Sequence, residues 1–211
     1  MKTIISAALL VLANAGAFAA DLDSASPKGS SQATHRGEPG FQLYGGAVFG
    51  ASHAEFNCVI IGGNSYTCDP TDTGFKVYGG FNITSNTAVE LAYIGFGQAT
   101  IKGTTSGVAF KVAQEANAWV LNGAWRFDMT PTFGGVVRVG LANVNSKISA
   151  STLGFYDSIS DKKVAPYGGF GLEYAVAAKL RLVAALDVTT SEIQSDKSTV
   201  GLLSIGVQYG F

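Results

Sequence analysis

The chain has 211 residues, of which 14% are charged and 27, or about 13%, are glycine, whereas typical soluble domains have about 25% charged residues and about 7% glycine. The hydrophobic share of 47% excludes a disordered chain, because disorder requires low hydrophobicity together with high charge. A formal net charge of −1, without a dense cluster of lysine and arginine, argues against a nucleic-acid partner.

The first 19 residues have the pattern of a secretory signal peptide. Lys2 supplies a positive charge, Ile4 to Leu12 form an apolar stretch, and Ala17-Phe18-Ala19 is a small-residue cleavage sequence. We therefore predict cleavage after Ala19, with an uncleaved membrane anchor as the alternative. Residues 20–40 are rich in serine, glycine, proline and charge, which predicts a flexible N-terminal extension. A short partner-binding segment is the alternative for that region.

From residue 41 to residue 211 apolar residues alternate with small or polar residues in a series of short segments. In the first segment Phe41, Leu43 and Phe49 occupy one face, and Gln42 and Tyr44 occupy the other. Successive side chains of a strand point to opposite faces, so this alternation predicts strands. The eight predicted strands span about 41–52, 74–83, 88–97, 116–127, 133–144, 164–176, 179–188 and 198–211.

The connections between the predicted strands alternate between tight turns and longer polar loops. This is typical of outer-membrane barrels, which have short periplasmic turns and long extracellular loops. Strands of about ten residues match the bilayer thickness, and a closed barrel leaves no unpaired edge in lipid. We therefore expect an all-β protein, an eight-stranded antiparallel up-and-down transmembrane β-barrel over residues 41–211. The predicted turns are Thr84–Thr87, Asp128–Thr132 and Ala177–Ala178, and the predicted loops are 53–73, 98–115, 145–163 and 189–197.

The two faces of the predicted strands differ in a way that suits a membrane. One face carries large apolar and aromatic residues for acyl chains and interfacial girdles, and the other carries glycine and almost all of the strand charges. Glycine on that second face leaves room in a lumen that is narrow in an eight-stranded barrel. The alternative is a soluble lipocalin-like barrel, which would place its apolar face inside and its charges outside.

Four segments resemble the eight-stranded outer-membrane barrel domain related to OmpA, OmpX and Ail, over about residues 41–211. The resemblance implies an integral protein of the Gram-negative outer membrane that contacts outer-membrane lipid. We expect a monomer, but the sequence does not fix the oligomeric state. It also implies that the last strand, with Tyr209 and Phe211, is the signal read by the barrel assembly machinery. The four segments are Tyr44–Gly50, Gly74–Phe81 with Val89–Tyr93, Pro166–Tyr174 and Ile205–Phe211.

Seven charged residues occupy inward positions of the predicted strands. A charge in a narrow lumen needs a partner, because an unpaired buried charge is costly. The resemblance implies that Glu90 and Glu173 belong to an interior salt-bridge network, whereas Arg181 is displaced by two residues from the usual arginine, which leaves its partner open. The network is interpreted as a structural plug or as a gate for small ions. Its members are Lys76, Glu90, Arg126, Arg138, Glu173, Arg181 and Asp187.

The two cysteines, Cys58 and Cys68, both lie in the predicted loop 53–73. A route through the oxidising periplasm predicts a disulfide that pins this loop, with two free thiols as the alternative. Only His53 lies nearby, so we expect neither a metal site nor a cofactor.

The sequence favours a structural envelope protein with loop-mediated surface interaction or adhesion, because binding function on rigid scaffolds usually lies in loops. By resemblance, an extracellular ligand of the loops is the expected partner, although the loops can equally just cover the barrel mouth. A small passive pore for ions or solutes is the first alternative. A lipid A-modifying enzyme is the second, but no acid/base set surrounds Ser52 and His53. We therefore expect no catalytic residue.

Overall fold

The computed structural model of the chain describes residues 43–54, 66–105, 108–152, 155–193 and 196–211. The predicted signal peptide, its cleavage site at Ala19 and the extension over 20–40 lie outside this described part and stay predictions. Within the described part, no helix is long and apolar enough to cross a membrane.

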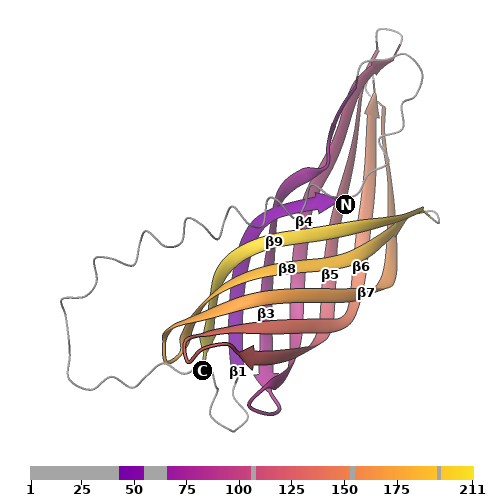
Figure 1. Cartoon of the computed structure of the whole chain (residues 1–211). Coiled ribbons are helices and arrows are strands. Elements are labelled where there is room, and N and C mark those ends of the chain that lie inside the picture. The colour runs from indigo at the N-terminus through magenta and orange to yellow at the C-terminus, as the bar shows by residue number, and fades with distance from the viewer. Residues whose placement is uncertain (1–42, 55–65, 106–107, 153–154, 194–195) are drawn as a thin grey trace, which may run out of the picture. The chain divides into compact units, whose positions relative to one another are not determined.

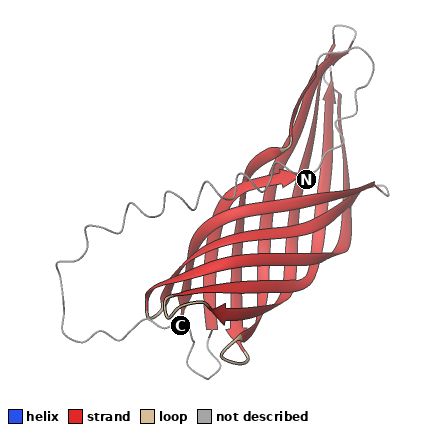
Figure 2. Ribbon diagram, viewed as in Figure 1, coloured by secondary structure: helices blue, strands red, loops and turns tan. Residues whose placement is uncertain are grey.

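The described residues form antiparallel strands that close into a β-barrel, which confirms the predicted fold class (Figure 2). Strand β1 pairs with β3 on one side and with β9 on the other, and the pairing of β4 with β5 completes the ring. Eight strands make up this ring, because β2 pairs only with β4 and is separated from β3 by Pro70 alone. The strands are β1 (Leu43–Ala54), β2 (Tyr66–Asp69), β3 (Thr71–Asn82), β4 (Thr87–Thr105), β5 (Val108–Asp128), β6 (Phe133–Thr152), β7 (Phe155–Ala177), β8 (Leu180–Ile193) and β9 (Asp196–Gly210).

The two faces of the barrel wall are opposite to those of a soluble barrel. On β5, Trp119 and Leu121 point outward with 57% and 60% of their surface exposed, whereas the intervening Val120 is fully buried. The same alternation of exposed apolar residues with buried residues recurs along β1, β3 and β9. The lumen face holds the charged residues together with glycine, alanine and a few larger apolar side chains. A soluble barrel with its charges outside is therefore excluded.

Three tight turns close one end of the barrel, close to their predicted positions. The chain turns at Ile83–Asn86, Met129–Thr132 and Ala178–Lys179. In the first turn the hydroxyl of Thr84 accepts hydrogen bonds from the backbone N–H groups of Asn86 and Thr87. These local side-chain bonds replace ladder bonds, which is the reason that serine and threonine favour turns.

The long predicted loops are largely strand, and this prediction was wrong in extent. Pairing of β4 with β5 continues to Thr105↔Val108, that of β6 with β7 to Thr152↔Phe155, and that of β8 with β9 to Ile193↔Asp196. Strands β4 to β7 therefore rise beyond the ends of the other strands (Figure 1). A sheet with water on both faces has no apolar side, so its sequence loses the apolar alternation by which a strand is recognised. Its backbone hydrogen-bond ladder is unaffected.

Part of the first predicted loop, 53–73, is also strand. Strand β1 continues to Ala54, β2 occupies Tyr66–Asp69, and β3 begins at Thr71. The last residue of β1 is joined to the residue between β2 and β3 by a backbone hydrogen bond of 3.0 Å, from the N–H of Ala54 to the carbonyl oxygen of Pro70. The intervening residues 55–65 lie outside the described part of the chain.

A β-bulge at Gly97 continues β4 where the sequence predicted its end. The backbone of Gly97 has a φ of 73°, a region that glycine adopts without steric cost. An added Cβ there would lie 2.6 Å from Oδ2 of Asp72, and that oxygen accepts a hydrogen bond of 2.6 Å from the N–H of Gln98. The extra residue reverses the inward parity, since Phe96 is buried before the bulge and Ala99 after it.

Candidate functional site

The seven charged residues predicted for the lumen all point into the barrel, and Glu90 is at the centre of the larger of two clusters. Its Oε2 accepts hydrogen bonds from Nε of Arg138 at 2.7 Å and from Nδ2 of Asn122 at 3.1 Å. Its Oε1 accepts one from the hydroxyl of Tyr44 at 2.7 Å and lies 3.4 Å from Nη2 of Arg126. The carboxylate of Glu90 is fully buried. Two guanidinium groups and two neutral hydrogen-bond donors compensate for the solvation that its charge has lost.

Glu173 on β7 extends this cluster toward the turn end of the barrel. Its carboxylate lies 3.3 Å from Nε of Arg126, 4.0 Å from Nη2 of Arg138 and 3.7 Å from Nη1 of Arg181. The partner of Arg181, which the sequence left open, is therefore Glu173. The larger cluster joins side chains from β1, β4, β5, β6, β7 and β8, so it braces strands that do not pair with one another.

A second cluster joins β3 to β7 and β8 across the lumen. Nζ of Lys76 lies 2.8 Å from Oδ1 of Asp187 and donates to the hydroxyl of Tyr167 at 3.0 Å. The hydroxyl of Tyr167 in turn donates to the same Asp187 oxygen. Strands β1 and β9 lie between β3 and β8 in the ring, so the Lys76–Asp187 pair passes over the β1–β9 seam.

Several neutral residues complete the network, and the sequence did not single them out. The hydroxyl of Tyr78 donates to Oε1 of Gln208 at 3.1 Å, a contact between β3 and β9 that also crosses the seam. An added Cβ at Gly80 would lie 2.5 Å from the ring of Tyr44, and one at Gly46 would overlap the ring of Tyr78. An inward glycine leaves room for a large ring on the neighbouring strand. Such a glycine is therefore the sequence feature from which the inward tyrosines could have been predicted.

Toward the opposite end, the lumen above the network is filled by apolar side chains. Ile94 and Leu202 are fully buried, and Phe96 and Val200 are buried nearby in the same core cluster. Alanines and valines of β5 and β6 complete this layer. The barrel interior therefore consists of a charged layer at the turn end and an apolar layer toward the projecting strands, as expected for an eight-stranded barrel that side chains just fill.

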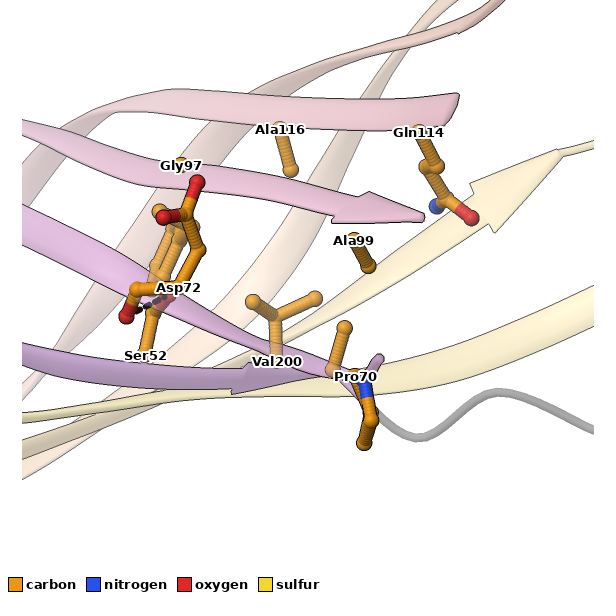
Figure 3. A pocket seen from close by; sticks show the side chains of 10 residues that line it. Ser52, Pro70, Asp72, Gly97, Ala99, Gln114, Ala116 and Val200 are labelled. Atoms are coloured by element: carbon orange, nitrogen blue, oxygen red, sulfur yellow. Dashed lines mark hydrogen bonds between the residues drawn. The ribbon is translucent and has the colours of Figure 1, made fainter. Parts of the chain in front are cut away.

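A shallow pocket lies at the mouth of the barrel above the apolar layer (Figure 3). The hydroxyl of Ser52 donates to the backbone carbonyl of Asp72 at 3.0 Å, so it is not bonded to a base. The neighbouring His53 points to the opposite face of β1, because adjacent residues of a strand alternate. The Ser52–His53 pair considered from the sequence is thus split between the two faces of the wall.

The projecting part of β7, residues 155–166, is an edge strand. It pairs with β6 on one side, and β7 pairs with β8 only from Tyr167↔Thr189 onward. No other strand pairs with its second edge in the described part of the chain. Two aspartates cap backbone donors of this segment: Oδ1 of Asp157 accepts from the N–H of Ser158, and Oδ1 of Asp161 from that of Lys162, both at 2.8 Å.

The remaining predicted site residues have the following positions. Cys58 lies outside the described residues and Cys68 is in β2, so their disulfide stays a prediction. The rings of Tyr209 and Phe211 are 5.5 Å apart, and the N–H of Phe211 donates to the carbonyl oxygen of Leu43 at 2.9 Å. Within the described ranges, no group of three or more histidine, cysteine, aspartate or glutamate side chains could hold a metal ion.

The sequence and the fold were compared with protein families and with solved structures. The model of the OmpA-like transmembrane domain family matches residues 41–211. The crystal structure of Ail, the attachment invasion locus protein of Yersinia pestis, is 15% identical, with 83% of this chain and 100% of that chain covered and a TM-score of 0.53. That of Neisserial surface protein A is 17% identical, with 80% and 97% covered and a TM-score of 0.51. No curated protein is significantly similar.

Proposed function

Because the chain belongs to the family of OmpA-like transmembrane domains, we propose that it is an envelope barrel whose projecting sheet makes contacts at the cell surface. The family and the similar solved structures point to the Gram-negative outer membrane. In such barrels the end with tight turns faces the periplasm, so the projecting strands β4 to β7 face outward. The last strand, with Tyr209 and Phe211, is the segment offered to the barrel assembly machinery.

One observation carries the adhesive role: a continuous sheet of β4 to β7, with the short β2 paired along β4, stands beyond the barrel where the sequence predicted loops. The β6–β7 ladder runs without a register shift from Phe133↔Tyr174 to Thr152↔Phe155. A ladder of this kind holds its side chains in fixed positions, which lowers the entropy that a partner must overcome on binding. The name of the similar Yersinia pestis protein, attachment invasion locus protein, agrees with a surface role for this fold.

The interior of the barrel favours a structural role over conduction. Each charged lumen residue has an oppositely charged partner within 4.0 Å, and the apolar layer above contains fully buried Ile94 and Leu202. A pore would require both layers to open. The split of Ser52 from His53 likewise gives no support to a lipid A-modifying enzyme, and we propose no catalytic function.

The test is to shorten the projecting sheet while the barrel is kept. Residues 100–113 of the β4–β5 hairpin and 147–160 of the β6–β7 hairpin are each replaced by a short Asn-Gly turn, which suits a two-residue hairpin. Cells that express either variant are expected to lose adherence to surfaces coated with fibronectin, laminin or collagen, relative to cells with the full chain. Heat-modifiable migration on SDS gels verifies that the variants are folded. Unchanged adherence of folded variants would contradict the adhesive role.

A further inference from the structure

The inner face of the projecting sheet is the side that continues the lumen wall. Tyr167 of β7 points into the barrel, and the pairing of β7 with β6 has no register shift, so the odd-numbered residues of β7 stay on this side up to Asp157. Residues paired across an antiparallel ladder share a face. The inner face is therefore formed by these residues, by even-numbered residues of β6 and β5 and, beyond the bulge at Gly97, by odd-numbered residues of β4.

The centre of this inner face is apolar. Two successive rows of residues across β4 to β7 consist mainly of aliphatic side chains, and Ile159 has 51% of its surface exposed. All strands of the described chain belong to one sheet, so no second described sheet covers these rows. Contiguous apolar side chains that face water mark interaction sites. The rows are Ile101, Val112, Ala150 and Asp157, farther from the barrel, and Ala99, Gln114, Ile148 and Ile159, nearer to it.

The edge of the inner face along β7 is acidic. Asp157 ends the row farther from the barrel, and Asp161 lies two residues beyond Ile159 on the same side of the strand. Each carboxylate caps a backbone N–H group through Oδ1, but neither has a basic side chain as a salt-bridge partner among the described residues. The base on this side of β7, Lys163, has a partner of its own. The apolar centre is therefore flanked by two carboxylates that can accept a cation.

One polar side chain, Gln114, stands within the apolar rows and lines the pocket at the barrel mouth (Figure 3). Gln114 is only 8% exposed, yet its amide forms no hydrogen bond with the rest of the described chain. A buried amide without a partner is costly. A glutamine amide holds an acceptor oxygen and two N–H donors, so it can pair with the N–H and the C=O of a peptide unit.

The dimensions of the inner face suit an extended peptide that crosses the strands. A row from β4 to β7 covers three spacings between neighbouring strands, about 14 Å, and four residues of extended chain cover about the same length. Alternate residues of such a peptide point to the same side. Three of its side chains therefore face the sheet, two over the apolar centre and one at the edge with Asp157 and Asp161.

We propose that this inner face binds an extended peptide segment of another protein, with two apolar residues at alternate positions followed by a lysine or arginine. The apolar side chains cover the two aliphatic rows, a peptide unit pairs with the amide of Gln114, and the cation lies beside Asp157 and Asp161. This inference rests on the surface role proposed above, and it adds to that role the face that is used and the chemistry of the partner.

The test uses the fluorescent synthetic peptide Thr-Ile-Thr-Val-Thr-Lys-Thr and measures its binding to the full chain in nanodiscs by anisotropy, with empty nanodiscs as the baseline. The variant Asp157→Asn with Asp161→Asn loses both charges but keeps the side-chain oxygens that cap the backbone, and we expect it to bind about fivefold more weakly. Gln114→Met should bind about tenfold more weakly, because two hydrogen bonds are lost. Glu115→Gln, at an exposed acid paired with Lys147 on the opposite face, is the matched control and should bind like the original chain.

A second peptide with glutamate in place of lysine separates charge recognition from simple apolar adsorption. It should bind more weakly than the lysine peptide to the original chain, and the difference should shrink in the variant without the two aspartates. Equal binding of both peptides to the original chain would overturn the proposal, as would unchanged binding by the aspartate variant.

A further variant, Val59→Ser with Ile60→Ser and Ile61→Ser, asks whether an apolar segment of the chain itself occupies the face. Binding that occurs only in this variant would overturn the proposal, whereas binding of equal strength in the original chain supports it. Heat-modifiable migration verifies that each variant is folded. Because the readout is peptide binding, unchanged binding by the aspartate variant would refute this inference alone, and the adherence of the hairpin variants would still decide the surface role.

Discussion

Nζ of Lys76 on β3 and Oδ1 of Asp187 on β8 lie 2.8 Å apart inside the barrel, although the seam between β1 and β9 separates their strands. The first and last strands of a barrel meet only when the ring closes. This ion pair therefore joins the N-terminal and C-terminal hairpins by side chains, in addition to the backbone bonds of the seam.

Replacement of Lys76 by methionine is expected to destabilise the barrel by about 3–5 kcal/mol, because Asp187 would be left as an unpaired buried charge. The double variant Lys76→Met with Asp187→Asn should recover more than half of that loss, since the amide still accepts from Tyr167. The measurement is urea unfolding in lipid vesicles, followed by tryptophan fluorescence. Lys179→Met, at an exposed turn, is the matched control. Equal losses in the single and double variants would contradict an ion pair that acts across the seam.

The seam also depends on glycines that face the lumen. An added Cβ at Gly50 would overlap the carbonyl oxygen of Leu203, and one at Gly206 would overlap that of Ala47. We expect Gly50→Ala and Gly206→Ala each to cost about 1–3 kcal/mol, as overpacking typically does, and to lower the heat-modifiable fraction in the outer membrane. Gly168→Ala is the control, because nothing lies within 4 Å of its added Cβ. If the two variants had a folded fraction as high as that of the control, the prediction would be wrong, because β1 and β9 would then be able to move apart and accept the added methyl group.

The lumen should not conduct in planar bilayers. Wild-type protein is expected to show no resolved current steps, because the apolar layer around Ile94 and Leu202 fills the interior above the charged layer. Glu90→Ala should also give no steps, but it should unfold at lower urea, since Arg138 and Arg126 lose one of their two carboxylates and keep only Glu173. Resolved steps in wild type would establish the pore alternative, and steps in the variant alone would indicate a gate.

The aspartates on the edge of β7 are expected to keep the chain monomeric. Asp157→Ala with Asp161→Ala would uncap the N–H groups of Ser158 and Lys162, and an exposed edge with free donors pairs with other strands. Light scattering in detergent should then show dimers or larger species. Ser158→Ala with Ser160→Ala alters the same edge without loss of the caps and should leave the monomer unchanged. A monomeric aspartate variant would show that the caps do not protect this edge.

Purified protein that has not been reduced should show no titratable thiol, because we predict that Cys58 and Cys68 are bridged. Closure of so short a loop is worth about 3 kcal/mol in the chain-entropy description, so Cys58→Ser with Cys68→Ser should lower the free energy of unfolding by up to that amount. Two reactive thiols per chain would eliminate the bridge. The thiols of the unfolded, reduced protein calibrate the reagent.

The sequence predicted the strands well only where the two faces of the wall meet different surroundings. Trp119 and Leu121 in lipid alternate with Val120 in the lumen, and this contrast is visible in the sequence. Above the membrane the contrast ends, and Lys102 and Lys111 look like loop residues although they are paired in a ladder. Hence the long strands were missed.

The inward charges followed from the same alternation, but their pairs did not. Arg138 and Glu90 are 48 positions apart in the chain, and whether they meet depends on the stagger of three strands around the ring. That stagger is fixed by the tilt of the strands and by the closure of the barrel. Neither property can be predicted from the residues of a single strand. The assignment of Arg181 to Glu173 was open for this reason.

The bulge at Gly97 has a consequence for how substitutions along β4 will be tolerated. Up to Phe96 the even-numbered residues fill the lumen, and from Ala99 the odd-numbered residues occupy the inner side. A saturation scan of β4 should therefore show a sensitivity pattern that changes phase at this glycine. Because the inward parity of the barrel and that of the projecting sheet are set separately on the two sides of this bulge, a one-residue deletion beyond position 97 is expected to disturb the register of the projecting sheet and to leave that of the barrel unchanged.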